Sequence, residues 1–232
     1  MRLTLSPLAL LLPANRHNQA MSAIRPDRRR RRHRLGLLGG TFDPVHNGHL
    51  ALATQVAATS KLDEVWFIPA QRSPLKARIP TSDRHRLAML ALALRDQPRF
   101  VISRVDLDRP APSYTTDTVE AVRAQVGEGP ALFLIAGADM LLDLPDWRDP
   151  DRLLSLCRVL AASRPGYPKE VPADLLAALP AARSRVAIVP ITKRDISSTL
   201  VRERLACGRS IHSLVAPAVE EYIREHRLYA AS

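Results

Sequence analysis

The sequence of 232 residues predicts an α/β domain built on one parallel, doubly wound sheet with a mostly helical C-terminal part. Short apolar runs alternate with segments of helical period, at the spacing of βαβ units with right-handed crossovers. The run at 131–136 is apolar throughout, as expected of a strand that is covered on both faces. A glycine-rich loop separates the first apolar run from the first helical segment. These observations favour a single domain of about two hundred residues.

In the first half of the chain, each apolar run is followed by a helical segment. Residues 35–38 predict a buried first strand, 48–58 the first helix, and 64–69 the second strand. Ser82 is a suitable N-cap for a helix that extends to about Arg95, and residues 100–105 alternate as a strand. The expected apolar positions are Leu50, Ala53, Thr54 and Ala57 in the first helix, and Leu87, Leu90, Ala91 and Leu94 in the second.

The second half repeats this alternation and ends in helices. A helix is predicted from about Tyr114, and the fourth strand over 131–136. In such a sheet the ligand binds outside the carboxyl ends of the strands, beside the point where the strand order reverses. The remaining predicted elements are a short helix after Asp139, a helix over 151–156, a strand over 158–162, a helix near 172–179, a strand over 186–189 and helices over 197–207 and 216–226.

The positive charge of the chain is concentrated near its N-terminus. Residues 1–34 contain nine arginines and one acid, which gives them +8 of the formal net charge of +11. We interpret residues 1–34 as a disordered basic extension and 35–232 as the domain; an arm that contacts anionic surfaces nonspecifically, or a start at Met21, is the alternative. No specific nucleic-acid interface is expected, because the domain is close to neutral and aromatic residues make up only 4% of the chain.

Cysteine usage and apolar segments indicate a cytoplasmic protein without a membrane span. Cys157 and Cys207 are the only cysteines of the sequence and form no CxxC pair, which fits a reducing compartment. The apolar run at 3–12 is not followed by an A-x-A site, and the arginine run lies on the wrong side of it for a signal peptide. No later segment is long and apolar enough to span a membrane.

The loop 39–49, GGTFDPVHNGH, is the candidate functional centre. It joins a buried strand to a helix N-terminus, where unpaired backbone N–H groups and the positive end of the helix dipole favour phosphate. His46 and His49 are three residues apart, so both imidazoles can face the same side of the first helical turn. A zinc pair or ordinary helix capping is the alternative, but no third cysteine or histidine is near.

Two motifs carry a resemblance to a known family. The spacing G-x-F-x-P-x-H-x-G-H over 40–49 resembles the nucleotidyltransferases of the Rossmann-like class. Residues 196–202, ISSTLVR, are similar to the [ST]-S-T-x-x-R element of that family, although alone they would indicate only a capped helix. The resemblance implies a Rossmann-like fold and transfer of a nucleotide from ATP or CTP. It also implies that the two histidines contact the nucleotide phosphates and stabilise the transition state, while the second element holds the β- and γ-phosphates.

The residue types suit that chemistry. A phosphate monoester has a second pKa of about 6, so it is largely ionised at neutral pH and attacks an α-phosphorus without a general base. Catalysis then requires alignment of two phosphates and donors for the developing charge. No Ser–His or cysteine nucleophile pattern is present, which fits direct displacement. No cluster of three carboxylates indicates a metal site built by the protein, so we expect Mg²⁺ to be bound mainly by substrate oxygens and water.

Further segments narrow the resemblance to the bacterial nicotinate-mononucleotide adenylyltransferases, over roughly residues 35–228. In that family the YTxDT loop and a tryptophan hold the nicotinate ring, the GxD element contacts ribose, and a lysine after the second strand reaches phosphate. The chain has SPLK at 73–76 where the family often has PPHK. The matching segments are GGTFDPVHNGHL, YTTDT from Tyr114, AGAD from Ala136, PDW with Trp147, RPGY from Arg164 and ISSTLVRERL.

The resemblance implies a set of site residues. For Trp147 the alternative to a site role is packing in the domain. For Lys76 the alternative is that of a solvated loop lysine. The implied catalytic residues are His46, His49 and Arg202. The implied ATP-binding residues are Gly40, Thr41, Phe42, His46, His49, Gly137, Asp139, Ser197, Ser198, Thr199 and Arg202. The implied mononucleotide-binding residues are Lys76, Thr115, Trp147 and Arg164.

The implied reaction transfers AMP from ATP to nicotinate mononucleotide by in-line displacement, giving nicotinate adenine dinucleotide and pyrophosphate in NAD biosynthesis. Transfer to nicotinamide mononucleotide or pantetheine phosphate is one alternative, although pantetheine-phosphate enzymes usually carry Thr where His46 stands. A nucleotide-responsive regulator that binds nucleic acid is another, and it would need basic and aromatic residues across the domain. ATP and nicotinate mononucleotide are therefore the expected partners, with assembly into a homo-oligomer left open.

Overall fold

A computed structural model confirms the predicted α/β class. It describes residues 31–71, 79–163, 169–192 and 195–230. Within these ranges six strands form one sheet in the order β3-β2-β1-β4-β5-β6, and every pairing is parallel. This order places β1 and β4 at the centre and makes the crevice between them the switch point of a Rossmann-like, doubly wound sheet.

The helices and strands follow one another as expected of βαβ units. The strands are β1 (Arg34–Gly40), β2 (Glu64–Pro69), β3 (Phe100–Ile102), β4 (Ala131–Gly137), β5 (Arg158–Ser163) and β6 (Val186–Pro190). The α-helices are α1 (Asn47–Thr59), α2 (Asp83–Leu94), α3 (Thr115–Val126), α4 (Pro150–Leu156), α5 (Ala173–Ala178), α6 (Ala182–Arg185), α7 (Ser198–Ala206) and α8 (Pro217–Glu225). Two 3₁₀ helices, η3 (Ala138–Leu141) and η4 (Leu144–Asp146), follow β4.

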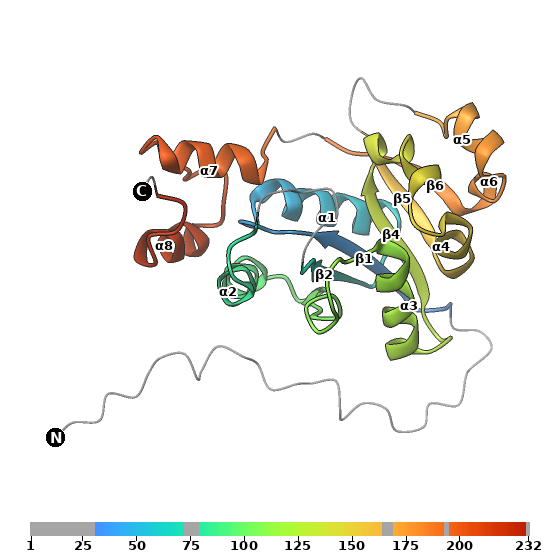
Figure 1. Ribbon diagram of the computed structural model, residues 1–232, viewed down its shortest axis with the longest axis horizontal. Helices are drawn as coiled ribbons and strands as arrows, with labels where there is room; N and C mark the ends of the chain where they lie inside the picture. Colours follow the sequence, from blue (N-terminus) through green and yellow to red (C-terminus); the bar gives the residue numbers. More distant parts are fainter. Residues whose placement is uncertain (1–30, 72–78, 164–168, 193–194, 231–232) are drawn as a thin grey trace. The chain divides into compact units, whose positions relative to one another are not determined.

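Each face of the sheet carries its own apolar core. One core joins α1, α2, α7 and α8 to one face, and the other joins α3, α4, α5 and α6 to the opposite face. Alternation along β1 divides its side chains between them, because Leu35 and Leu37 belong to the second core and Leu38 to the first. In Figure 1, α7 and α8 lie beside α1 and α2, whereas α4, α5 and α6 lie at the opposite side of the picture.

The buried face of α2 differs from the prediction. Leu87 and Ala91 are only half-buried, whereas Met89 and the charged Arg86 are fully buried. The charge of Arg86 is tolerated there because its guanidinium donates to main-chain carbonyls and to the carboxylate of Asp83. A prediction from apolar positions assigns every charged residue to the surface. It therefore placed Arg86 on the exposed face and predicted the wrong buried face for α2. In α1, similarly, the predicted Thr54 is exposed and Val56 is buried.

The compact unit of the molecule runs from His33 to Ser232. β1 includes Arg34, which was assigned to the basic extension. Its backbone N–H donates to Asp63 Oδ2 at 2.8 Å, and its guanidinium lies 4.2 Å from the ring centroid of Phe133. Arg34 is therefore part of the domain, whereas residues 1–30 of the predicted extension 1–34 lie outside the described ranges. None of the helices in the described ranges is long and apolar enough to cross a membrane.

Candidate active site

A cavity of about 190 Å³ lies at the carboxyl ends of the central strands. Its walls come from the segments after β1, β4 and β6 and from β5, at the edge of the sheet where the sequence places the ligand. Pockets that enclose a whole ligand typically have about 300–1,000 Å³, so this cavity fits only part of a dinucleotide. The lining residues are His46, Gly48, His49, Ala51, Leu52, Gly137, Asp139, Ala162, Ile191, Thr192 and Ile196.

The loop between β1 and α1 is held from behind by buried polar groups. Arg86 Nη1 donates to the carbonyls of Thr41 at 2.7 Å and Ala70 at 2.8 Å, and its Nε donates to Thr81 O at 3.0 Å. The N–H of Ala70 in turn donates to Gly40 O at 2.9 Å. One buried guanidinium therefore joins the loop after β1 to the loop after β2 and to the start of α2.

Phe42 turns this loop with a positive φ of 50°, in the left-handed region that residues other than glycine rarely adopt. Its ring is 1% exposed and meets the His49 ring edge-on, with 4.9 Å between the centroids. Because its side chain is buried, Phe42 supports His49 from the core, and its contact with ATP stays a prediction.

His46 and His49 lie ring against ring at the start of α1. Their centroids are 3.6 Å apart, with 25° between the ring planes. His46 occupies the N-cap position, and its backbone N–H donates to His49 Nδ1 at 3.2 Å. Because Nδ1 is the acceptor, neutral His49 carries its proton on Nε2. Both imidazoles occupy the same side of the first turn, as their spacing predicts.

Burial keeps His46 neutral. The residue is 7% exposed, and desolvation lowers its pKa from 6.5 to about 4. Its Nδ1 has no hydrogen-bond partner in the described part of the chain. At neutral pH this imidazole therefore carries one N–H donor and no net charge.

Gly48 leaves room for the His46 ring. A Cβ at position 48 would lie 2.9 Å from His46 Nδ1 and 3.3 Å from the carbonyl oxygen of Ile196. Atoms in well-packed interiors do not approach so closely, so a side chain here would displace the imidazole or the segment before α7. The motif therefore requires glycine at position 48 for steric reasons.

The N-terminus of α7 is hydrogen-bonded to the loop after β1. Ser198 Oγ donates to Pro44 O at 2.9 Å, and Arg202 Nη1 donates to Asp43 O at 2.7 Å. The partners in these two bonds are 154 and 159 residues apart in the sequence. The fold therefore brings the two motifs of the sequence into direct contact.

The same helix end is ordered by its own side chains. Ser197 is the N-cap, and its Oγ accepts the backbone N–H of Leu200 at 3.0 Å. Arg202 Nη2 donates to Thr199 Oγ1 at 3.1 Å, which draws the guanidinium back toward the first turn. The positive charge of Arg202 thereby adds to the positive end of the helix dipole, an arrangement that favours anions.

Gly137 and Asp139 form another wall of the cavity, directly after β4. A Cβ at Gly137 would overlap the carboxylate of Asp139, so the glycine allows this side chain to fold back against the chain. Asp139 is exposed. Its carboxylate is therefore accessible to a ligand, and the ribose contact stays a prediction.

Thr115 and Trp147 lie on two segments that a hydrogen bond joins. Thr116 Oγ1 donates to Arg148 O at 2.6 Å, and the Arg148 guanidinium pairs with Asp117 at 3.1 Å. The N-terminus of α3 and the segment after η4 are therefore neighbours. Thr115 and Trp147 are both half-buried, and neither is among the described residues that line the cavity.

Two predicted site residues, Lys76 and Arg164, lie outside the described residues. In the ranges that the structure covers, no group of three or more His, Cys, Asp or Glu side chains could hold a metal ion. Binding of Mg²⁺ by substrate oxygens and water stays a prediction.

Sequence reasoning missed the buried residues that hold the loop after β1. Asp43 is 2% exposed, and its carboxylate accepts the Thr81 N–H at 3.3 Å and the Tyr229 hydroxyl at 2.7 Å. These partners are 38 and 186 residues away in the sequence. The position of Asp43 inside the motif was the only signal, and nothing in the sequence pointed to Arg86 or Tyr229.

The chain is similar to known adenylyltransferases over most of its length. Residues 37–204 match the family model described as cytidylyltransferase-like. A "Probable nicotinate-nucleotide adenylyltransferase" of Roseiflexus sp. strain RS-1 is 45% identical over 196 residues, covering 84% of this chain and 97% of the relative. The nicotinate-nucleotide adenylyltransferase of Bacillus subtilis is 38% identical over 197 residues, covering 84% and 98%. In fold, the nicotinic acid mononucleotide adenylyltransferase of Plasmodium falciparum, solved with NaAD, has a TM-score of 0.69 at 17% identity, covering 84% of this chain and 97% of its own.

Proposed function

The chain belongs to the nicotinate-nucleotide adenylyltransferase family, and we propose that it transfers the AMP group of ATP to nicotinate mononucleotide. The products are nicotinate adenine dinucleotide and pyrophosphate, in NAD biosynthesis. One observation carries the proposal: the His46–His49 pair and the N-terminus of α7 with Arg202 meet at the end of β1. Donors and positive helix ends are thereby gathered beside a cavity at the switch point of the sheet.

The proposed reaction is a direct displacement at phosphorus. An oxygen of the mononucleotide phosphate attacks the α-phosphorus of ATP and forms the new P–O bond. The bond from the α-phosphorus to the bridging oxygen breaks, and pyrophosphate leaves with the electron pair. Because the attacking phosphate is already ionised at neutral pH, the protein contributes alignment and charge stabilisation rather than a general base.

We assign the α-phosphoryl group to the histidine pair. The Nε2–H of His49 is the donor of its ring, since Nδ1 accepts the N–H of His46. His46 acts as a neutral dipole, because its pKa of about 4 leaves it uncharged at neutral pH. Donors that are fixed before the reaction stabilise transition-state charge by about 3 kcal/mol each.

The β- and γ-phosphates are assigned to the N-terminus of α7. Two of the five guanidinium N–H groups of Arg202 are used by Asp43 and Thr199, which orient the side chain. Its remaining donors are available to a phosphate. Ser197, Ser198 and Thr199 place backbone N–H groups at the same helix end, where the dipole favours the leaving pyrophosphate.

The mononucleotide is assigned to the N-terminus of α3 and the segment after η4. The backbone N–H of Thr115 faces the carboxylate in this assignment, and Trp147 stacks on the pyridinium ring. The hydrogen bond from Thr116 to Arg148 supports it, because it holds the two segments together. On resemblance alone, Lys76 is assigned to a phosphate contact and Arg164 to mononucleotide binding.

Three further proposals accompany this function. Mg²⁺ enters with ATP, bound to phosphate oxygens and water, and neutralises phosphate charge there. The protein is cytoplasmic, which fits the free thiols of Cys157 and Cys207. Assembly into a homo-oligomer stays a prediction, and sedimentation of the purified protein measures it.

Turnover with defined substrates tests the function. Purified protein is mixed with ATP, Mg²⁺ and either nicotinate mononucleotide, nicotinamide mononucleotide or pantetheine phosphate, and pyrophosphate release is measured. We expect the fastest release with nicotinate mononucleotide, with the dinucleotide identified by its mass. Release with pantetheine phosphate alone would assign another family activity. Binding of RNA without any release of pyrophosphate would favour the alternative of a nucleotide-responsive regulator that binds nucleic acid.

A further inference from the structure

Asp43 is the point where three distant segments meet the loop after β1. Its buried carboxylate accepts the Tyr229 hydroxyl at Oδ1 and the Thr81 N–H at Oδ2. The main-chain carbonyl of the same residue accepts Arg202 Nη1 at 2.7 Å. A buried carboxylate needs hydrogen-bond donors, so these partners fix its side chain. Fixing the side chain also fixes the peptide group to which Arg202 is bound.

Tyr229 reaches Asp43 through an unusual backbone. α8 ends at Glu225, and Arg227 and Tyr229 then adopt φ values of 50° and 61°. Residues other than glycine rarely populate this left-handed region, and such conformations persist where the surrounding structure determines them. Two of three consecutive residues thus take an unfavourable conformation, and the result is that the Tyr229 hydroxyl lies against the loop.

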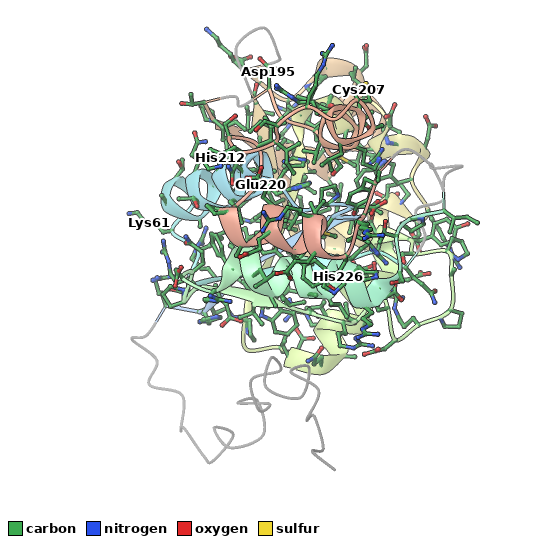
Figure 2. All side chains as sticks on the ribbon, turned by 90° about the vertical axis from the view of Figure 1, so that its left-hand side faces the viewer. Lys61, Asp195, Cys207, His212, Glu220 and His226 are labelled. Atoms are coloured by element: carbon green, nitrogen blue, oxygen red, sulfur yellow. The ribbon has the colours of Figure 1, made fainter. Side chains whose placement is uncertain are left out.

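The helix before Tyr229 is anchored independently of that hydroxyl. Ile223 is buried in the core shared with α2, and the hydroxyl of Tyr222 lies 2.9 Å from His85 Nδ1. Figure 2 shows α8 lying along α2, with His226 just beyond its last turn. Loss of the Tyr229 hydroxyl is therefore expected to act locally, at the loop, rather than to release α8.

We propose that Tyr229 is a positioning residue for the transfer reaction. Its hydroxyl holds Asp43, and the carbonyl of Asp43 then directs Arg202 toward the phosphates of ATP. This proposal rests on the proposed function, in which Arg202 binds those phosphates. In this proposal Tyr229 makes no contact with substrate and acts through Asp43 and Arg202.

Tyr229→Phe tests the proposal, because it removes one hydroxyl and keeps the ring. Tyr222→Phe is the matched control, since it also removes a hydrogen-bonded hydroxyl from the C-terminal region but one that does not contact the loop. With ATP and nicotinate mononucleotide varied separately, Tyr229→Phe should lower kcat/KM for ATP about tenfold, with KM for the mononucleotide changed less than about twofold. Tyr222→Phe should keep wild-type values within about twofold.

A double-mutant cycle separates positioning from general loosening. In the Arg202→Ala background, Tyr229→Phe should cause less than about a twofold further loss, because the residue through which it acts is gone. Wild-type kcat/KM for ATP in Tyr229→Phe, or the same loss in both backgrounds, would overturn the proposal. So would a loss that only matches a lower folded fraction, measured by thermal unfolding of both tyrosine variants.

Calorimetric titration with ATP and Mg²⁺, without mononucleotide, separates this proposal from the proposed function. Wild-type protein that binds ATP but does not turn over nicotinate mononucleotide would contradict the function alone. The titration then still decides the role of Tyr229: an ATP affinity about tenfold lower in Tyr229→Phe than in Tyr222→Phe supports positioning, and equal affinities overturn it.

Discussion

At the scale of single residues, burial decides how the histidine pair works. Two imidazoles with centroids 3.6 Å apart would repel each other if both were protonated, and the low pKa of His46 prevents this at neutral pH. The pair then offers N–H donors in a fixed geometry without adding two charges to the site. Gly48 contributes by leaving space for the His46 ring.

The depressed pKa of His46 predicts a pH-dependent stability. The unfolded imidazole binds a proton near 6.5 and the folded one only near about 4, so between these values the unfolded state holds more protons. The free energy of unfolding should therefore fall as the pH falls through this window, by about 1.4 kcal/mol per unit and about 3 kcal/mol in all. Urea unfolding of wild type and His46→Gln between about pH 7 and 5 measures the difference. Parallel curves for the two proteins would contradict the low pKa.

Replacing His49 should affect catalysis more than folding. We expect His49→Ala to lower kcat by on the order of 10², because one preorganised donor at the α-phosphate contributes about 3 kcal/mol. His212, an exposed histidine paired with Glu220 at 3.1 Å, provides the control variant His212→Ala, which should keep wild-type turnover. Pyrophosphate release gives kcat, and circular dichroism checks the fold. Equal turnover in a folded His49→Ala protein would remove this residue from the mechanism.

Among the residues that line the cavity, the sequence predicted His46, His49, Gly137 and Asp139 as site residues, whereas the buried residues behind the loop were not predicted. His46, His49 and Asp139 follow from motif spacing and strand ends, because local order along the chain determines their positions. Arg86 and Tyr229 act through partners that only the tertiary fold brings near. No periodicity marks a buried arginine, since periodic patterns assign charge to the surface.

At the scale of elements, the proposed site uses the starts of three helices. The bond from Ser198 to Pro44 joins the N-terminus of α7 to the loop that precedes α1, and the N-terminus of α3 adjoins the segment of Trp147 through Thr116. Each helix start presents backbone N–H groups without helical partners. The substrates assigned to them carry a triphosphate and a carboxylate, which are the groups such N–H donors favour.

The start of α3 predicts selectivity for the acid mononucleotide. Tyr114 at its N-cap position makes no side-chain cap bond in the described structure, so the N–H groups around Thr115 are not capped by that residue. A helix start favours a carboxylate over an amide by about 0.3–2 kcal/mol, and an unpaired donor facing the amide costs about 1–3 kcal/mol. We expect kcat/KM for nicotinate mononucleotide to exceed that for the nicotinamide form by about tenfold to a thousandfold. Comparable values would mean that Thr115 is misassigned.

The types and order of the elements were predicted better than their orientations. Apolar runs located five of the six strands in the described ranges, because strands covered on both faces leave a continuous signal, and alternation located β3. β3 ends at Ile102 rather than continuing to Val105, and residues 105–108 form a turn. Alternation alone does not show where a strand loses its neighbour. The predicted buried face of α2 was wrong because the buried residue Arg86 is charged.

At the scale of the whole molecule, we expect the basic extension to determine binding to polyanions and the domain to determine catalysis. The compact unit begins at His33, whose carbonyl accepts the Ala131 N–H at 2.7 Å. The domain therefore contains its first strand without residues 1–32. Eight arginines and one acid precede that boundary, so residues 1–32 carry +7 of the formal net charge of +11.

Deleting residues 1–32 should leave kcat within about twofold of wild type, because no element of the sheet is removed. Retention on heparin should become weaker and less dependent on salt, since fewer cations are released or exchanged on binding. A deletion that also removes His33 and Arg34 is the matched comparison and should lower the melting temperature, because the Arg34 backbone N–H donates to Asp63 and its guanidinium stacks on Phe133. A folded but inactive protein that lacks only residues 1–32 would show that the extension reaches the site.

The strand order affects how the protein folds while the ribosome synthesises it. β1 lies between β2 and β4, and the partner of Arg34 on the β4 side is Ala131. At about 5–20 residues per second, β4 emerges on the order of ten seconds after β1, and until then one edge of an apolar strand is open to other nascent chains. Tyr229 emerges later still. A newly made chain thus completes its sheet before Asp43 receives its hydroxyl partner, and the site is among the last parts to take its final form.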